Sequence, residues 1–154
     1  MYILILEFFN LFCAGVLAGT EIAVHYAIHP TMIVLDERPQ IVLRQGLIRK
    51  LRWLVPTFFV PVLFSGVAVT IANWEVPRLY FCIAAMIAVI VWIIIRIIGT
   101  VPVNSVTIEW DADAPPKDWR EQIEKVEQFH VIGTWAATLA FIFFLTNLAL
   151  SIHS

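Results

Sequence analysis

Residues 79–98 read LYFCIAAMIAVIVWIIIRII, and this stretch decides the fold. Apart from Arg96 near its end, it carries no charged residue. A helix needs roughly 20 apolar residues to cross a hydrocarbon core of about 30 Å. Because backbone in lipid must satisfy its own hydrogen bonds, we predict that this stretch is a transmembrane helix.

The composition of the whole chain points the same way. The chain has 154 residues, of which 60% are hydrophobic and 14% charged, with a mean hydropathy of +0.85. Soluble domains have about 25% charged residues, so this is an integral membrane protein with the lipid bilayer as its main partner. A net charge of -2 gives no reason to expect a nucleic-acid partner. Cys13 and Cys82 fall inside apolar runs and are expected to be small buried side chains.

Three further segments are long enough to span the bilayer, at residues 2–27, 54–72 and 131–152. The N-terminal run has no Lys or Arg before it and no small-residue cleavage site after a short apolar core, so we expect it to be retained as a span. The predicted fold is therefore all-α, an integral membrane up-down four-helix bundle in a single domain over residues 1–154. A short amphipathic helix within residues 115–130 should lead into the fourth span.

The cationic residues are concentrated in two of the three connections. The polar connection at residues 35–53 and the connection at about 100–129 together hold eight of the ten Lys and Arg residues, whereas the turn between them holds only Arg78. Lys and Arg are enriched in cytoplasmic loops. We therefore predict that loops one and three are cytoplasmic and that both termini lie outside.

This topology gathers ionisable residues at one end of the bundle. Glu21, His25 and His29 are spaced four apart, which places them on one face of a helix. Since a proline disfavours helical geometry in the residue before it, the helix is expected to end or kink at His29, which leaves His25 the better-placed imidazole. On the fourth helix, Glu127 and His130 have the Glu-x-x-His spacing by which carboxylate-bridged metal bundles project two ligands.

Each of these patterns also has a simpler interpretation. A Glu-x-x-His pair on a charged helix is typical of a solvated face, and a His-x-x-x-His near the interface is explained by contact with water. Glu21 favours a functional cluster, because an ionisable group within a span costs about 2.5 to 3.5 kcal/mol and generally faces a partner or a cavity. Imidazole and carboxylate suit transition metals, with iron or copper favoured here. The predicted ligands are Glu21, His25, His29, Glu127 and His130; the alternative is a polar cluster with no cofactor.

Other polar residues within the spans are expected to have ordinary roles. Arg96 is expected to extend to the interface, although pairing with Glu21 or binding an anionic substrate group stays open. Glu7 is expected to be exposed at the outer interface, and Asn10 to form a hydrogen bond between helices.

Four further residues have expected positions. Trp92 is expected to pack or to face lipid, and His153 to be a solvated tail residue. Pro102 should end the third helix and place Asn104 in a turn at the level of the histidines, where it either orients a ligand or caps the turn.

Taken together, a span ending in HP, the PVN that follows the third span, the tryptophan of DWRE and a histidine before the last span resemble one family. This is the family of small four-helix membrane proteins that includes the fungal anthrone oxygenases, and the resemblance covers nearly the whole chain. The chain departs from the family where Val126 and Gly133 replace a frequent Trp and Arg. The matching positions are Pro30, Pro102, Asn104, Trp119 and His130.

The resemblance implies oxygen-dependent oxidation of a small hydrophobic aromatic compound, such as anthrone to anthraquinone, without an added cofactor. Such chemistry needs a base, and His130 or His25 would suit because imidazole titrates near neutral pH; Asn104 is the third candidate catalytic residue. Our first hypothesis is a membrane oxidoreductase of oxygenase type, acting on an aromatic or quinone-like substrate near the cytoplasmic face. The second is a non-catalytic metal-, haem- or quinone-binding subunit of a larger membrane complex, with His25 and His130 as axial ligands. A structural or transport role, and association into a homo-oligomer, also stay open.

Overall fold

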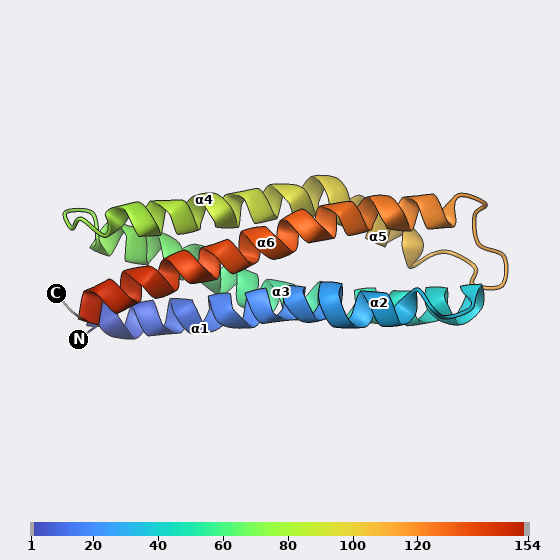
Figure 1. Ribbon diagram of the computed structural model, residues 1–154, viewed down its shortest axis with the longest axis horizontal. Helices are drawn as coiled ribbons and strands as arrows, with labels where there is room; N and C mark the ends of the chain where they lie inside the picture. The colour runs from blue at the N-terminus through green and yellow to red at the C-terminus, as the bar shows by residue number, and fades with distance from the viewer. Residues whose placement is uncertain (1, 153–154) are drawn as a thin grey trace.

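The computed structural model describes residues 2–152, so the predicted tail residue His153 lies outside the described residues. Four helical segments are long and apolar enough to cross a membrane: Tyr2–Met32, Glu37–Ala72, Leu79–Thr107 and Trp119–Ile152. They run up and down in one bundle, with both ends of the chain at the same end (Figure 1). The predicted all-helical four-helix bundle is confirmed.

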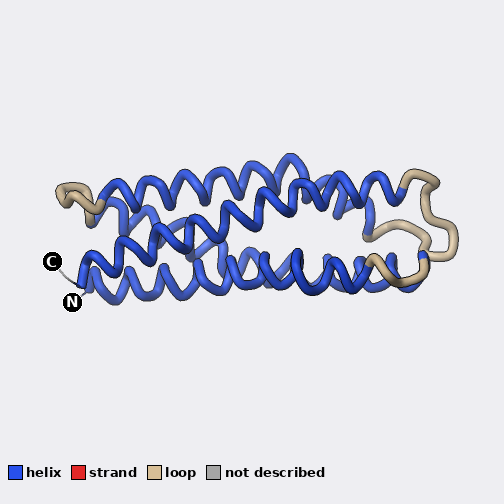
Figure 2. Tube along the Cα trace, viewed as in Figure 1, coloured by secondary structure: helices blue, strands red, loops and turns tan. Residues whose placement is uncertain are grey.

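Two of the four segments are continuous helices and two contain a wider turn. The first segment consists of α1 (Tyr2–Ile22), the π-helical η1 (Ala23–Ile28) and α2 (His29–Met32), and the second is α3 (Glu37–Ala72). The third consists of α4 (Leu79–Ile95), the π-helical η2 (Arg96–Thr100) and α5 (Val101–Thr107), and the fourth is α6 (Trp119–Ile152). The tan connections in Figure 2 lie only at the two ends of the bundle.

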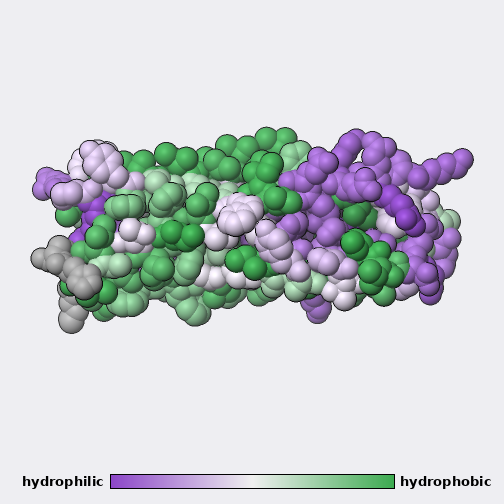
Figure 3. Space-filling view, in the orientation of Figure 1, coloured by the Kyte–Doolittle hydropathy of each residue, from purple (hydrophilic) through white to green (hydrophobic). Residues whose placement is uncertain are grey.

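The predicted polar connection at residues 35–53 is mostly helical, because α3 already begins at Glu37. The inward face of this polar stretch is buried through Gln40, Ile41, Arg44 and Gln45, so tertiary packing holds it helical. The 36 residues of α3 correspond to about 54 Å at the rise of an α-helix, well beyond a hydrocarbon core of about 30 Å. The bundle accordingly has an apolar half near the termini and a polar half near connections 33–36 and 108–118, which we call the connection end (Figure 3).

Neither Pro30 nor Pro102 ends its helix, contrary to prediction. Each proline lies two residues after a π-helical segment, η1 in the first case and η2 in the second. In an α-helix a proline has no N–H to donate, and its ring clashes with the carbonyl four residues earlier. A π turn pairs each N–H with the carbonyl five residues earlier, and this shift lets the helix continue through the proline. As a result His29 remains helical, and Asn104 lies on α5 and not in a turn.

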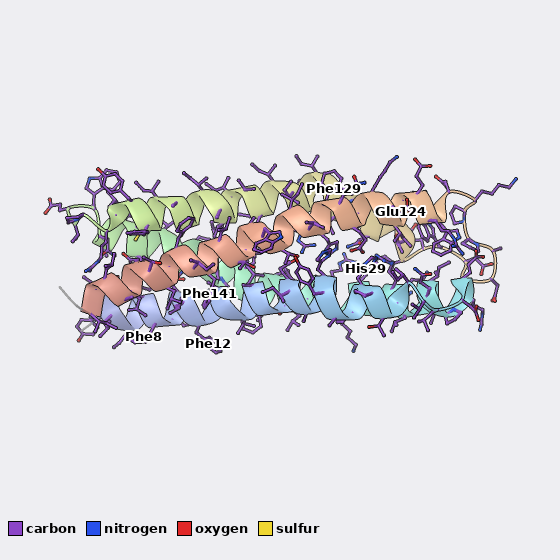
Figure 4. All side chains as sticks on the ribbon, in the orientation of Figure 1. Phe8, Phe12, His29, Glu124, Phe129 and Phe141 are labelled. Atoms are coloured by element: carbon purple, nitrogen blue, oxygen red, sulfur yellow. The ribbon has the colours of Figure 1, made fainter. Side chains whose placement is uncertain are left out.

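The apolar half of the bundle is closely packed around small side chains. Ala14, Ala85 and Ala140 are 0–3% exposed and allow close approach of α1, α4 and α6. Cys13 and Cys82 are buried and free, as predicted. On the outer side of α1, Phe8 and Phe12 point away from the bundle, and Phe141 lies between α1 and α6 (Figure 4). The described helices thus present apolar rings to lipid and small residues to one another.

Glu7 is 3% exposed, so the prediction of interfacial exposure is wrong. Its Oε1 accepts hydrogen bonds from Asn73 Nδ2 at 3.1 Å and from Asn147 Nδ2 at 3.0 Å. Asn10 forms the predicted contact between helices, donating to Ser65 Oγ at 2.9 Å. The end of the bundle that holds the termini therefore has its own buried polar layer.

Candidate ligand-binding site

A cavity of about 430 Å³ lies where the apolar half of the bundle meets the polar half. This volume is in the range of small-molecule sites. All four long helical segments contribute to its wall. On the apolar side the wall is formed by Val55, Phe59, Trp92 and Ile93. The polar and charged lining residues are Thr20, Glu21, His29, Arg44, Arg52, Arg96, Thr100, Asn104, Ser105, Glu127 and His130.

Glu21 is the most deeply buried charged group of the cavity, at 2% exposure. One carboxylate oxygen pairs with Arg96 Nη2, and the other accepts a hydrogen bond from Trp92 Nε1 at 3.1 Å. Arg96 therefore turns into the bundle and does not extend to the interface as expected. Trp92 packs in the core, which was one of its two predicted roles, and it also serves as a hydrogen-bond donor.

Three side chains from two other helical segments lie close to the carboxylate of Glu127. Arg44 Nη1 lies 3.1 Å from Oε1, His29 Nε2 lies 3.4 Å from the same oxygen, and His25 Nδ1 lies 3.8 Å from Oε2. Figure 4 shows His29 between α2 and α6. Arg44 is 5% exposed and was not among the predicted site residues. The spacing of Ile41, Arg44, Gln45 and Ile48 would have indicated one helical face at this point.

His130 lies on α6 at the polar edge of the cavity and is 8% exposed. Arg96 Nη1 is 3.4 Å from its Nδ1 and 3.5 Å from its Nε2. A guanidinium has only donors, so His130 is the acceptor in this contact. Glu21, Arg96 and His130 thus form one continuous polar row from α1 to α6.

The structure brings most of the predicted site residues to one cavity. Glu21, His29, Asn104, Glu127 and His130 line it, whereas His25 reaches Glu127 without lining the cavity. The prediction that His25 is better placed than His29 depended on a helix end at Pro30, which the structure does not have. Trp119 also lies apart from the cavity: it is buried against Ile41 and Ile123 and donates to Glu37 Oε2 at 3.1 Å.

As arranged, these residues do not fit a metal ion. Among residues 2–152, no group of three or more His, Cys, Asp or Glu side chains could hold one. The two carboxylates bind guanidinium groups instead, through Arg44 and Arg96. Together with Arg52, the lining arginines exceed the lining glutamates by one positive charge when the imidazoles are neutral. A bound cation would add to that excess positive charge. The reaction proposed for this cavity therefore uses no metal, and the metal site stays a prediction.

Several buried donors of residues that line the cavity have no hydrogen-bond partner in the described part of the chain. They are Arg44 Nε and Nη2, Arg96 Nε and the hydroxyl of Thr100. An unsatisfied buried polar group costs about 1–3 kcal/mol. A ligand that carries oxygen acceptors would satisfy these groups. The cavity therefore favours ligands with acceptor oxygens over ligands that only donate.

Comparison of the chain with family models, with curated proteins and with solved structures finds no match.

Proposed function

We propose that this protein is an integral membrane oxidoreductase of oxygenase type, acting on a small aromatic or quinone-like substrate in the cavity. The observation that carries the proposal is that an apolar surface and a polar surface meet in one cavity. Phe59, Trp92 and Ile93 form an apolar wall, and His130 and Arg96 lie on the polar side of the same cavity. An aromatic ring that carries an oxygen suits such a junction, because its ring packs on the wall while its oxygen meets donors.

The reaction converts an activated methylene of the substrate to a carbonyl with molecular oxygen as the oxidant. A base removes one C–H proton, and the carbanion, stabilised as an enolate, reduces O₂ and forms a C–O bond. The resulting hydroperoxide loses water to leave the carbonyl. One substrate and one O₂ thus give one ketone and one water, and no other reductant is needed.

Residues that line the cavity can be assigned to each of these steps. His130 is the base, because it is buried at the polar edge and one of its ring nitrogens is an acceptor beside Arg96. Arg96, held by Glu21, stabilises the enolate oxygen as charge develops on it. Asn104 orients the same oxygen from α5, and His29 with Glu127 closes the polar wall.

The direct test is oxygen uptake by the purified protein in detergent with anthrone as the substrate. We expect anthraquinone to form in step with oxygen consumption, detected by its absorption. His130→Gln should lower kcat by about 100-fold or more, the usual contribution of a general base. His29→Gln should lower the rate more than His25→Gln, because only His29 lines the cavity.

A matched control lies about two turns further along α6. Thr138 donates its hydroxyl to the carbonyl of Thr134 on its own helix at 2.8 Å and does not line the cavity. Thr138→Val should keep full activity. If anthrone is not oxidised above the rate in empty micelles, or if His130→Gln is as active as Thr138→Val, the proposal is wrong.

The second candidate is a quinone-binding subunit of a larger membrane complex. The unpartnered donors of Arg44 and Arg96 favour it, since quinone carbonyls are acceptors. Such a subunit would bind a quinone such as menadione without consuming oxygen, which separates it from an oxygenase. A haem held by His25 and His130 has less support, because these two side chains do not line the same cavity.

The orientation in the membrane follows from the bias of Lys and Arg toward the connection end, which supports a cytoplasmic location for that end. The native cysteines Cys13 and Cys82 are buried, so they should give little background in a thiol-labelling test. Ala114→Cys and Glu75→Cys place exposed thiols at opposite ends of the bundle. In intact cells, a membrane-impermeant maleimide should label only Glu75→Cys; labelling of Ala114→Cys alone would reverse the orientation.

A further inference from the structure

The cavity reaches the outer surface of the bundle at one place. Five of its lining residues are exposed, and they form two ridges with a spacing of four residues. Arg52 and Pro56 form the ridge on α3, and Ile97, Val101 and Ser105 form the ridge on η2 and α5. The opening therefore lies on the side of the bundle, between α3 and the η2–α5 segment.

The rim of this opening is apolar on one side and polar on the other. Ile97 and Val101 are 64% and 54% exposed, and Pro56 lies beside them at the start of the apolar half of α3. Arg52 and Ser105 lie on the polar side of the same rim. The rim is apolar on the side toward the termini and polar on the side toward the connection end. Such an opening suits an amphiphile that is already dissolved in the bilayer.

The interior of the cavity matches an anionic head group. Arg44, which is 5% exposed, and Arg96 line the cavity and together hold three buried N–H groups without partners in the described part of the chain. Thr100, at 2% exposure, adds an unpartnered hydroxyl. Guanidinium groups bind oxyanions with strong charge-assisted hydrogen bonds. One monoanionic head would supply acceptors for these donors and balance the excess positive charge of the lining, which Arg52 carries at the rim.

We infer that the ligand of this cavity is a membrane-dissolved amphiphile with a monoanionic oxygen head, which enters sideways between α3 and the η2–α5 segment. Its head binds Arg44, Arg96 and Thr100, and its apolar tail leaves through the opening into the bilayer. The inference rests on the proposed function for its role in turnover, in which the enolate oxygen of the aromatic substrate would take the place of the anionic head. It requires no water-filled path from either end of the bundle.

The test is competition for a fluorescent fatty acid, 11-(dansylamino)undecanoate, with the protein in lipid nanodiscs and empty nanodiscs as background. Dodecanoate should displace the probe at least 10-fold more effectively than 1-dodecanol, which has the same tail and no charge. Acetate, which has the same head and no tail, should not displace it. Equal potency of dodecanoate and dodecanol, or displacement by acetate, would overturn the inference.

Variants locate the head and the opening separately. Thr100→Val should weaken dodecanoate binding by about 10-fold or more, consistent with loss of one hydrogen bond to a charged group, and leave dodecanol unchanged. Ile97→Trp should block the opening and weaken dodecanoate by 10-fold or more. Ile98→Trp is the matched control, because Ile98 is 66% exposed and does not line the cavity. Equal effects of the two tryptophans would exclude this opening.

The two proposals fail in different ways. If dodecanoate binds as described but anthrone is not oxidised, the proposed function is wrong and the ligand class stands. If anthrone is oxidised but dodecanoate does not compete for the probe, the ligand class is wrong and the proposed function stands.

Discussion

Arg96 on the third helical segment forms an ion pair with Glu21 on the first, and both residues line the cavity. The two residues are 75 positions apart in the chain, and Glu21 is almost wholly buried. A buried charge left without its partner is strongly destabilising, because desolvation is no longer offset. The pair therefore fixes the register of α1 against α4 at the edge of the cavity.

Arg96→Met should lower the free energy of unfolding by about 3 kcal/mol, the usual effect of removing one partner of a buried pair. The double variant Glu21→Gln with Arg96→Met should recover most of that loss, because Glu21→Gln removes the buried charge and keeps an acceptor for Trp92. Unfolding in mixed detergent micelles, followed by circular dichroism, measures both. Equal stability of the single and double variants would show that the pair does not carry this energy.

Gly99 allows η2 to lie against α6 next to His130. A Cβ at this position would overlap the ring of Phe129, the residue before His130. Gly99→Ala should therefore destabilise the fold by about 1–3 kcal/mol through overpacking, and it should also reduce substrate oxidation. The measurements are thermal unfolding and oxygen uptake.

Gly46→Ala is the matched control for that substitution. Gly46 also lies within a helix, and a Cβ there would meet nothing within 4 Å. Because alanine favours a helix over glycine by about 1 kcal/mol, this variant should be as stable as the wild type or more so. If both alanine variants behave alike, the contact between Gly99 and Phe129 has no structural role.

The sequence was sufficient for those features that the bilayer itself imposes. Apolar runs of spanning length must be helices in lipid, and the distribution of Lys and Arg between the loops predicts that Glu21, His25, His29, Glu127 and His130 lie at one end of the bundle. Features that depend on tertiary packing could not be predicted from the sequence. The polar stretch that begins at Glu37 resembles a loop, since its inward positions are polar, and only its partners on α6 and α5 explain its helical form.

The prolines show the same limit in a different way. Pro30 and Pro102 predict helix ends by local sterics, but the preceding π turns η1 and η2 remove the conflict. No local signal marks a π turn. The consequence for the site was direct, because His29 and Asn104 remain on helices and face the cavity.

Glu7 gives a separate prediction at the other end of the bundle. Glu7→Leu would leave the amide groups of Asn73 and Asn147 without their acceptor in a buried layer, and it should destabilise the fold by about 2 kcal/mol. Glu7→Gln keeps one carbonyl acceptor and should cost less than about 1 kcal/mol. Chemical unfolding measures both, with the exposed Glu75→Leu as a control that should be neutral. Equal losses in the two variants would mean that the negative charge, which both remove, stabilises the layer and the acceptor alone does not.

Metal analysis tests the predicted site of Glu21, His25, His29, Glu127 and His130. Because Arg44 and Arg96 bind the two carboxylates, we expect the purified protein to hold less than one equivalent of iron or copper and to show no metal absorption band. His25→Ala and His130→Ala should then leave the metal content unchanged. A stoichiometric metal that is lost in both variants would show that the carboxylates exchange guanidinium for metal, and the site would have to be redrawn with imidazole ligands. Elemental analysis of protein prepared without chelators, compared with Thr138→Val, decides between the two outcomes.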